Sequence, residues 1–526
     1  MSHLHYYSPS PKLASPQERT VDLCCYGQSP AAITAAVEAR RHGLSTVVVL
    51  NARNLGGLSA GGLSNTDIGN KHVIGGLARE FYQRVGAHYE RDEEWRFEPH
   101  VAESVFAGML SEAGVAVLFR EYPVAVSKVG TRLHALQCES GLTIVARQFI
   151  DASYEGDLMA LAGVRSHIGR EGNDVYGESY NGVQVHATHQ FDSAVDPYRI
   201  EGDSTSGLLP GINPEPLAPI GSGDQKLQAY NFRLCLTQAV DRIPFLQPPG
   251  YDPLDYELLA RYFRGGWRDL FHKFDRIRGG KADVNNHGAV STDFIGGSWS
   301  FATATWPERE KIFQAHVRWQ QGLLWFLATD PRVPVGLQRS LRSWGLPRDE
   351  FLPTGGWPPQ LYIREARRMV SDYVITEHDC LGRRRATDGV GMGAYGMDSH
   401  NCQRVVKEGR VINEGDVQVS GFAPYPISYR ALTPRASEAE NLLVPVCLSS
   451  SHIAYGSVRM EPVFMILGQS AAIAASLALR RGCAVQSVPY SDLQRELTRA
   501  GQVLAWQPAE GESAAYEPEA PPPIPR

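Results

Sequence analysis

The chain lacks several patterns that would point to particular classes of protein. Its 526 residues include eight cysteines but no Cys-x-x-Cys pair, which disfavours a zinc site, an iron–sulfur cluster or a dithiol redox centre. The net charge is −6 and no long basic run occurs, so nucleic acid and anionic membranes are not expected partners. We predict no metal site, and we expect reduced cysteines in a cytoplasmic protein.

Long apolar runs are also missing, and no stretch is long enough to cross a bilayer. The longest candidate, residues 463–479, is interrupted by Gly468, Gln469 and several serines. The first 17 residues have neither an apolar core nor a cleavage-site pattern, so we predict a disordered leader rather than a signal peptide. The Pro- and Glu-rich residues 507–526 are predicted to be a disordered tail.

The first stretch that carries chemistry is "YGQSPAAITAAVEARRHGLSTVVVL", which is typical of a turn, a helix and a strand. Gly27, Ser29 and Ala32 stand at the three glycine positions of the dinucleotide-binding fingerprint G-x-G-x-x-G. Ser29 and Ala32 are small enough to replace glycine, and the Ser29 hydroxyl could donate to a phosphate. Asn51 stands where an acidic residue usually binds the ribose, which predicts weaker binding at that point.

A glycine-rich loop follows the second strand, in the sequence "NLGGLSAGGL". It contains the pairs Gly56-Gly57 and Gly61-Gly62. A nicotinamide-binding unit has no need of glycines at this position, whereas FAD has to be approached closely by backbone along its pyrophosphate and ring. The loop therefore favours FAD.

Further segments narrow the assignment: "FIDASYEGDLMALAGV", "YGESYNG", "QAYNFRLCLT" and "PYPISYRALTPRASEAENLLVPVCLSSSHIAYGSVRMEPVFMILGQSAAIAASLAL". Together with the fingerprint and the glycine loop, they resemble one large bacterial branch of the FAD-dependent oxidoreductases, which have a glutathione-reductase-type flavin fold. The resemblance extends in pieces from about residue 20 to 500. It implies an α/β fold in which a discontinuous Rossmann-type FAD-binding domain carries an inserted α+β substrate domain and a helical region.

Pattern and resemblance together predict the organisation of the chain. Residues 74–116 and 307–380 are expected to be helical, residues 117–150 to form strands, and "SSHIAYGSVRMEP" to be a loop before a long helix. The tryptophan-rich helical region could cover a homodimer interface or the substrate cavity. The predicted division is a leader (1–17), the first parts of the FAD-binding domain (18–165), a substrate domain (166–306), a helical region with a substrate-side segment (307–420), the C-terminal part of the FAD-binding domain (421–500) and a tail (507–526).

The resemblance implies that the FAD is bound noncovalently. Neighbouring families attach flavin through a histidine just before the glycine-rich loop, and "NARNLGGL" has none. The residues expected to contact FAD belong to the fingerprint, the glycine loop, the "DASYEGD" segment and the C-terminal helix. They are Gly27, Ser29, Pro30, Ala31, Ala32, Asn51, Ala52, Gly56, Gly57, Leu58, Gly61, Gly62, Leu63, Asp151, Gly156, Gly468 and Gln469.

Substrate oxidation by a flavin also requires a base that removes a proton from O–H or N–H. His452 and Arg459 are candidates for the base and for a charge that stabilises reduced flavin, although hydrogen bonding within the loop and capping would also explain them. His400 and Asp398 in "GMDSHNCQR" form a second candidate pair. The residues expected to bind substrate are Asn286, His287, Tyr395 and Tyr455.

The leading functional hypothesis is a dehydrogenase or oxidase that takes hydride from a C–OH or C–N bond of a small polar substrate. The alternative is a flavin monooxygenase reduced by NAD(P)H. No second complete G-x-G-x-x-G occurs, which counts against a built-in site for a second dinucleotide. The missing Cys-x-x-Cys disfavours a disulfide reductase, and nothing in the sequence favours a flavin-binding protein without catalytic activity.

Overall fold

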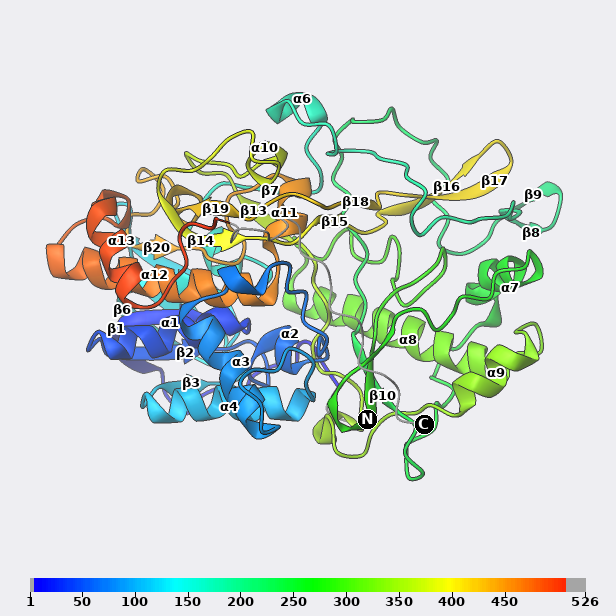
Figure 1. Ribbon diagram of the computed structural model, residues 1–526, viewed down its shortest axis with the longest axis horizontal. Helices are drawn as coiled ribbons and strands as arrows, with labels where there is room; N and C mark the ends of the chain where they lie inside the picture. Colours follow the sequence, from blue (N-terminus) through cyan, green and yellow to red (C-terminus); the bar gives the residue numbers. More distant parts are fainter. Residues whose placement is uncertain (1–3, 508–526) are drawn as a thin grey trace.

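The computed structural model describes residues 4–507, and its largest sheet has seven strands (Figure 1). The order is β3-β2-β1-β6-β5-β4, and β20 pairs with β6 off this path. β1 runs parallel to β2 and β6, whereas β4 and β5 form an antiparallel hairpin at one edge. The strands are β1 (Gln17–Tyr26), β2 (Thr46–Val49), β3 (Ala116–Leu118), β4 (Pro123–Val129), β5 (Arg132–Cys138), β6 (Leu142–Asp151) and β20 (Leu442–Leu443).

The buried strands owe their position to apolar and β-branched residues. All four residues of β2, Thr-Val-Val-Val, are buried, as expected for a parallel strand covered on both faces. Cys24 and Cys25 of β1 are fully buried and act there as small apolar residues. All eight cysteines are unpaired, as predicted.

Two long helices from opposite ends of the chain cover the sheet (Figure 1). They are α1 (Pro30–Arg41) and α12 (Glu461–Arg481). A Cβ on Gly468 of α12 would overlap the Ala31 carbonyl of α1, so the two backbones approach closely only because glycine stands there. By length and composition α12 could cross a membrane, but 94% of its most apolar window is buried inside the protein.

The part drawn in green in Figure 1, with helices α7, α8 and α9, forms the other half of the molecule, whereas β13, β14 and β19 lie over the half that contains the sheet. The longest element of the green part is helix α8 (Trp306–Thr329), which starts at a capping box formed by Thr305 and Glu308. The remaining elements of the chain are α2 (Gly57–Ala60), α3 (Gly76–His88), α4 (Pro99–Glu112), α5 (Asp157–Leu161), β7 (Ser166–Ile168), α6 (Asn173–Tyr176), β8 (Tyr198–Ile200), β9 (Asp203–Leu208), β10 (Leu234–Thr237), α7 (Glu257–Arg264), β11 (Phe274–Arg276), β12 (Lys281–Val284), α9 (Val335–Arg342), β13 (Arg367–Met369), α10 (Glu377–Cys380), β14 (Gly389–Gly393), β15 (Met397–Ser399), β16 (Gln403–Lys407), β17 (Arg410–Glu414), β18 (Val417–Val419), β19 (Tyr425–Ser428), α11 (His452–Val458) and α13 (Tyr490–Arg499), with short 3-10 turns between them.

The structure confirms the predicted α/β class with a parallel sheet. Two of its elements differ from those predicted from the sequence. Helix in the 307–380 region ends at Arg342 apart from the short α10, because prolines and glycines recur from Pro334 to Pro359. The expected loop "SSHIAYGSVRMEP" contains helix α11, which Ser451 caps by accepting a hydrogen bond from the Ala454 N–H.

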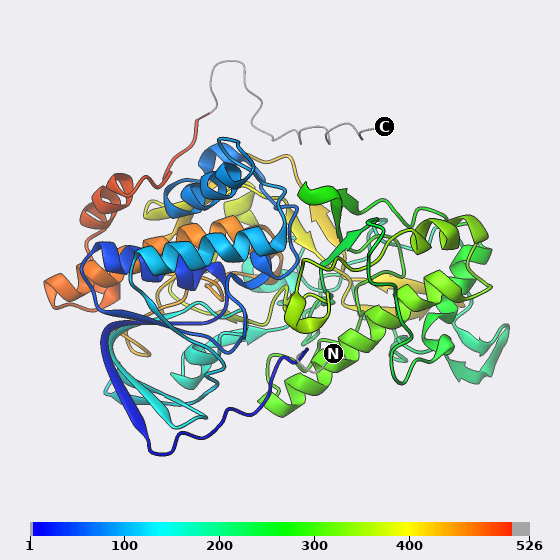
Figure 2. The same cartoon turned by 90° about the horizontal axis from the view of Figure 1, so that it is seen from below.

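The expected leader also differs, because residues 4–16 have a defined path. Residues 4–10, which we call the N-terminal strap, run from the sheet to helix α8 (Figure 2). Leu4 is buried, and Tyr6 packs edge-on against Phe301 at 5.4 Å between ring centres. Apolar and aromatic side chains therefore hold a segment that looks disordered by composition. The predicted tail lies outside the described residues except for Gln507.

Candidate functional site

The fingerprint turn lies where β1 ends and α1 begins. Gly27 has a φ of +119°, and a Cβ there would overlap the backbone of Ala152 and Ser153 beyond the end of β6. Ser29 Oγ donates to the Ala152 carbonyl over 2.6 Å, so this hydroxyl binds protein rather than facing a phosphate as expected. The turn is thus fastened to the end of the neighbouring strand.

The first glycine pair of the loop packs directly on this turn. Gly56 and Gly57 have φ values of +79° and +52°, and a Cβ on Gly57 would overlap the Tyr154 hydroxyl. That hydroxyl accepts from the Leu58 N–H over 3.0 Å and donates to Glu461 over 2.9 Å. The loop, the "DASYEGD" segment and helix α12 therefore meet at one point, as a discontinuous FAD-binding domain requires.

Other residues expected to contact the cofactor have protein neighbours instead. A Cβ on Gly61 would overlap the Gln360 side chain, and one on Gly62 would overlap the Arg233 carbonyl, so both glycines allow the inserted region to approach. Asp151 accepts hydrogen bonds from the N–H groups of Ser153 (3.1 Å) and Met159 (2.7 Å), and burial raises its pKa to about 6. Of the others, Pro30, Ala31 and Ala32 start α1, Gly156 caps α5 at a φ of +70°, the Ala52 carbonyl accepts from the Arg120 N–H, and Leu63 is buried.

Gly468 and Gln469, which with the loop before them were expected to face the flavin, contact other helices in the structure. Gly468 is pressed against α1, as described above. Gln469 donates to Glu38 over 2.9 Å and accepts from the Leu77 N–H over 2.8 Å. The two residues join α12 to α1 and α3. The small size of Gly468 and the side-chain amide of Gln469 both serve the packing of these helices.

The N-terminal strap reaches Asn51, the position where the ribose is expected to bind. Tyr6 donates to Glu155 over 2.5 Å, and its hydroxyl lies 3.5 Å from Asn51 Nδ2 at the end of β2. Gln28, inside the fingerprint, donates to the same Glu155 oxygen over 2.9 Å. Burial raises the pKa of Glu155 to about 7, so this carboxyl takes up a proton more readily than an exposed glutamate does.

Unsatisfied acceptors at this end fit the ADP half of FAD. Asn51 Oδ1 and Gln28 Oε1 are buried, and neither has a hydrogen-bond partner among the described residues. A buried acceptor without a donor costs about 1–3 kcal/mol, and ribose hydroxyls or an adenine amine would supply donors. The Tyr6 hydroxyl lies beside Asn51 as well, so we expect a nucleotide bound at this end to compete with the strap.

All four predicted catalytic residues come together in a second group of polar side chains. Asp398 and His400 flank the end of β15, whereas His452 and Arg459 bound helix α11, which packs on β15. Asp398 Oδ2 lies 3.3 Å from Arg459 Nη2 and 3.4 Å from His400 Nε2. The side chain of Asp398 is 24% exposed, whereas those of His400 and Arg459 are buried.

The two histidines of this group have different partners. His400 Nδ1 lies 2.8 Å from Asp293, which itself pairs with Arg364. His452 lies 2.9 Å from Glu365 through Nδ1 and 2.9 Å from Ser399 Oγ through Nε2. Ser399 is fully buried and donates to the Gly415 carbonyl over 3.0 Å. Both nitrogens of His452 are therefore engaged within the protein.

Electrostatics keeps the acids of this group ionised. Burial alone would raise the pKa of Asp398, but the opposite charges of His400 and Arg459 outweigh burial and hold that pKa well below its usual range. Arg364 and His400 lower the pKa of Asp293 in the same way against the effect of burial. His400 thus lies between two carboxylates, Asp293 and Asp398.

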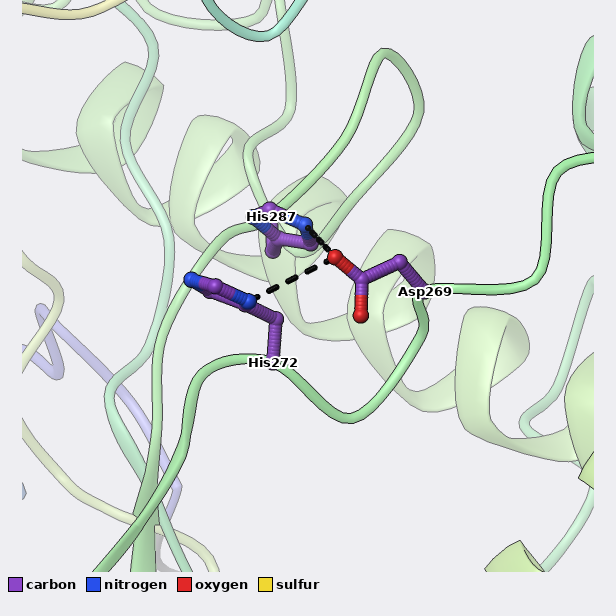
Figure 3. A group of neighbouring side chains, drawn as sticks. All are labelled: Asp269, His272 and His287. Carbon is purple, nitrogen blue, oxygen red and sulfur yellow. Dashed lines mark hydrogen bonds and ion pairs between the residues drawn. The ribbon is translucent and has the colours of Figure 1, made fainter.

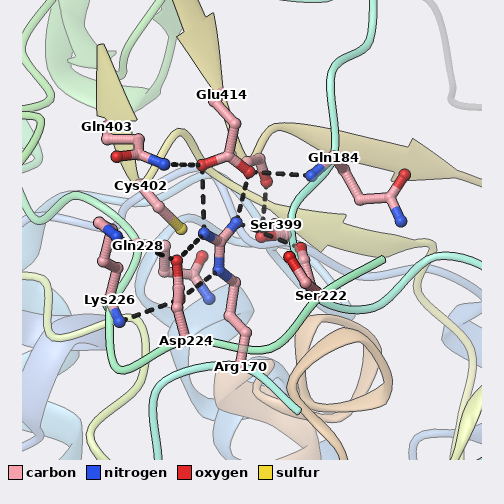
Figure 4. A network of polar contacts seen from close by, with 12 residues as sticks. Arg170, Gln184, Ser222, Asp224, Lys226, Gln228, Ser399, Cys402, Gln403 and Glu414 are labelled. Carbon is pink, nitrogen blue, oxygen red and sulfur yellow. Dashed lines mark hydrogen bonds and ion pairs between the residues drawn. The ribbon is translucent and has the colours of Figure 1, made fainter. Parts of the chain in front are cut away.

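A network of ion pairs supports the strands next to this group (Figure 4). Arg170 is fully buried and contacts Glu414 over 2.6 Å and Asp224 over 2.6 Å. Glu414 also accepts from the Gln403 amide over 2.9 Å. Arg170 therefore ties β16 and β17 to the segment that follows β7.

The predicted substrate-binding residues are divided between different places. Tyr395 donates to Asp67 over 3.2 Å, and Asp67 and Asp398 both raise its pKa, so Tyr395 belongs to the same polar group. Tyr455 is buried and donates to the Val446 carbonyl over 3.2 Å. Asn286 is buried, and its neighbour His287 faces Asp269 and His272 in a separate, more exposed cluster (Figure 3).

Several residues that complete these groups were not predicted from sequence. Asp293 and Glu365 are the carboxylates that bind His400 and His452, and Tyr362 binds Arg459 over 2.9 Å. Each lies in a segment far along the chain from its partner, so spacing gave no signal. Glu155 was also not predicted as a site residue, although its place in "DASYEGD" put it near the fingerprint.

Comparison with known proteins places this geometry in a family. The family model described as FAD dependent oxidoreductase matches residues 22–497. No curated protein matches the chain. Solved structures match at low similarity. A geranylgeranyl bacteriochlorophyll reductase-like protein from Thermoplasma acidophilum has 18% identity and a TM-score of 0.21 over 28% of this chain and 43% of that one.

Two further solved structures match to a similar extent. L-amino acid deaminase from Proteus vulgaris has 13% identity and a TM-score of 0.24, over 31% of this chain and 55% of that one. L-proline dehydrogenase from P. horikoshii has the same identity and TM-score, over 30% of this chain and 59% of that one. The matched parts thus cover less than two thirds of each neighbour. The family match covers nearly the whole length of the chain, and the parallel sheet and the fingerprint turn agree with it. The chain therefore belongs to the FAD-dependent oxidoreductases.

Proposed function

We propose that this FAD-dependent oxidoreductase is a dehydrogenase or oxidase that acts on a C–OH or C–N bond of a small polar substrate. The observation that carries the proposal is the approach of His400 and Arg459 to the partly exposed carboxylate of Asp398. A base, a cation and a carboxylate at one partly exposed position suit a substrate that loses a proton from O–H or N–H.

His400 is the base in this proposal. Asp293 holds Nδ1 over 2.8 Å and so fixes the ring, which leaves Nε2 on the side of the exposed Asp398 to take the substrate proton. His452 is the weaker candidate because buried partners hold both of its nitrogens at 2.9 Å, whereas Nε2 of His400 has only the longer 3.4 Å contact with the partly exposed Asp398. In this proposal Asp398 and Arg459 orient the polar group of the substrate.

The cofactor would be held at the fingerprint turn and by Asn51 and Gln28, without a covalent bond. When bound, FAD supplies the hydride acceptor. The described segment before the glycine loop has no histidine for covalent attachment, which supports noncovalent binding. We further propose the domain division derived from the sequence, a homodimer and a cytoplasmic location, the last supported by eight unpaired cysteines.

The test is an anaerobic screen of the purified protein after reconstitution with FAD. Bleaching of the flavin absorbance by one of a panel of alcohols, sugars and amines is the expected result. Bleaching only by NAD(P)H, with oxygen from O₂ found in the product, would establish the monooxygenase alternative instead. A protein that takes up no FAD under any condition would overturn the proposal as a whole.

A variant then tests the role of His400. His400→Gln should slow bleaching by roughly 10²–10⁴-fold, the usual contribution of a general base, without loss of bound FAD. The control is His88→Gln, because His88 is exposed at the end of α3. If the rate with His400→Gln stays within a few-fold of wild type and keeps its pH profile, His400 is not the base.

A further inference from the structure

The region outside the FAD-binding sheet contains a cavity of about 380 Å³. Its walls come from helix α8, from residues 210–214 and 290–299, from the start of β16, and from Asp255 and Leu258. This volume lies in the range of cavities that hold a small organic ligand. None of the residues named above as catalytic lines it.

Most of the wall is apolar and aromatic. Phe294 and Trp319 lie nearly parallel, with ring centres 5.2 Å apart and 15° between their planes. Trp299 is fixed by a hydrogen bond from Nε1 to the Cys402 carbonyl over 2.9 Å. Flat, rigid surfaces of this kind favour a flat apolar ligand.

One buried cation interrupts this apolar wall. Arg404 is only 3% exposed. Its Nη2 donates to the Ala289 carbonyl over 2.9 Å, whereas its Nε is buried and has no partner among the described residues. No carboxylate in the described part of the chain lies within ion-pairing distance of this guanidinium. Burial lowers the pKa of Arg404 to about 10, and the attraction of Asp293 opposes that shift only in part.

Asp293 does not serve as the missing counter-ion. Its carboxylate already contacts Arg364 over 2.9 Å and His400 over 2.8 Å. The other buried arginines named above each pair with a carboxylate, as Arg170 does with Glu414. A buried charge is normally paired because desolvation disfavours it, so Arg404 lacks a partner that a bound anion would supply.

We propose that this cavity binds a flat, apolar carboxylate, whose ring lies against Phe294, Trp299 and Trp319 and whose carboxylate pairs with Arg404. A guanidinium suits this geometry because its N–H groups match the two carboxylate oxygens. A phosphate fits less well, since Arg404 is the only buried guanidinium among the described residues of the cavity wall, and the second one, Arg318, is exposed, where water competes for its N–H groups. The inference rests on the cavity alone and does not depend on the redox function.

The test is titration of the full-length protein by calorimetry with phenylacetate and indole-3-acetate. We expect one site per chain, with binding at least about tenfold weaker for the neutral amides of the same acids, because they lack the charge that pairs with Arg404. Inorganic phosphate should not compete. Equal affinity for acid and amide, displacement by phosphate, or no binding of either acid at millimolar concentration would overturn the proposal.

Variants assign the charge to one residue. Arg404→Gln should weaken binding of the preferred acid by at least about tenfold, and Arg404→Lys, which keeps the charge, should weaken it less. Arg318→Gln is the matched control, because Arg318 lines the same cavity but is exposed, and its affinity should stay within about twofold of wild type. A larger loss from Arg318→Gln than from Arg404→Gln would contradict the assignment. If Arg404→Gln does not fold by circular dichroism, the acid–amide comparison on wild type still decides.

Discussion

At the scale of single residues, buried ion pairs hold together the segments around the candidate site. Arg170, Asp224 and Glu414 come from three segments and meet in the interior, where little solvent screens their charges. Removal of Arg170 leaves Glu414 buried without a counter-ion. Such a single removal destabilises the fold more than the replacement of the whole group by apolar residues would. The free energy of unfolding that is lost in such a substitution therefore measures how strongly this network stabilises the packing of the segments.

We predict that Arg170→Met lowers the free energy of unfolding by about 3–5 kcal/mol, because Glu414 would remain buried and unpaired. The measurement is chemical denaturation followed by circular dichroism. The control is Arg430→Met, which removes an exposed pair with Asp388 and should cost at most about 1 kcal/mol. Similar losses for the two variants would show that the Arg170 network contributes no more than a surface pair.

The residue types at the candidate site could be predicted from sequence, but not their partners. His400 and Asp398 lie two positions apart, so a local motif revealed them. Asp293 binds His400 from 107 positions away, and Glu365 binds His452 from 87 positions away. Contacts at such separations depend on the tertiary fold, and periodicity within a window of residues carries no information about them.

At the scale of elements, the N-terminal strap is the segment whose position bears most directly on cofactor binding. Glu310 of helix α8 contacts His5 over 2.8 Å and accepts from the Tyr7 N–H over 2.9 Å, while Gln314 donates to the Leu4 carbonyl. These contacts with α8 are few. We therefore expect local opening of the strap to cost less free energy than global unfolding.

We predict that truncation of residues 1–10 increases the affinity for FAD by about tenfold or more, because the closed strap reduces the fraction of binding-competent protein. Tyr6→Ala should give a smaller increase. The measurement is equilibrium titration followed by flavin fluorescence, with Lys12→Ala as the control outside the strap. Equal affinities for truncated and full-length protein would contradict competition, whereas failure of both to bind FAD would count against the proposed function.

Among the elements, those with strong local signals were predicted from sequence and short ones were not. The β1–α1–β2 unit and α12 follow from apolar runs, Pro30 at the helix start and Gly482 at the end of α12. Helix α11 has only seven residues and depends on the Ser451 cap and on packing against β15. The strap depends on helix α8, some 300 positions away, and composition alone indicates disorder there.

At the scale of the whole molecule, Glu461 connects distant parts of the chain. It stands at the start of α12 and accepts hydrogen bonds from Ser59 of the glycine loop and from Tyr154. Burial raises its pKa from 4.5 to about 7. The folded protein therefore keeps a proton that the unfolded chain releases, so its contribution to stability is complete below pH 4.5 and is lost as the pH rises through 7.

We predict that the wild-type protein loses about 2–3 kcal/mol more stability than Glu461→Gln between pH 5 and pH 8, because glutamine does not titrate. Denaturation of both proteins at several pH values measures the difference. Glu112→Gln is a suitable control, since Glu112 lies on the surface of α4. Parallel pH profiles for wild type and Glu461→Gln would mean that Glu461 stays ionised in the folded state.

The docking of the strap on helix α8 also fixes an order of events during translation. The fingerprint turn, the end of β6 and the strap's partner Glu155 exist once residue 155 has been made, but the contacts of the strap with α8 wait until that helix begins at Trp306, about 155 residues after Asp151. At roughly 5–20 residues per second this interval is on the order of ten to thirty seconds. Until it ends, Tyr6 lacks the part of its docking surface that Phe301 and helix α8 provide, so we expect the strap to be held less firmly beside Asn51 in the nascent chain.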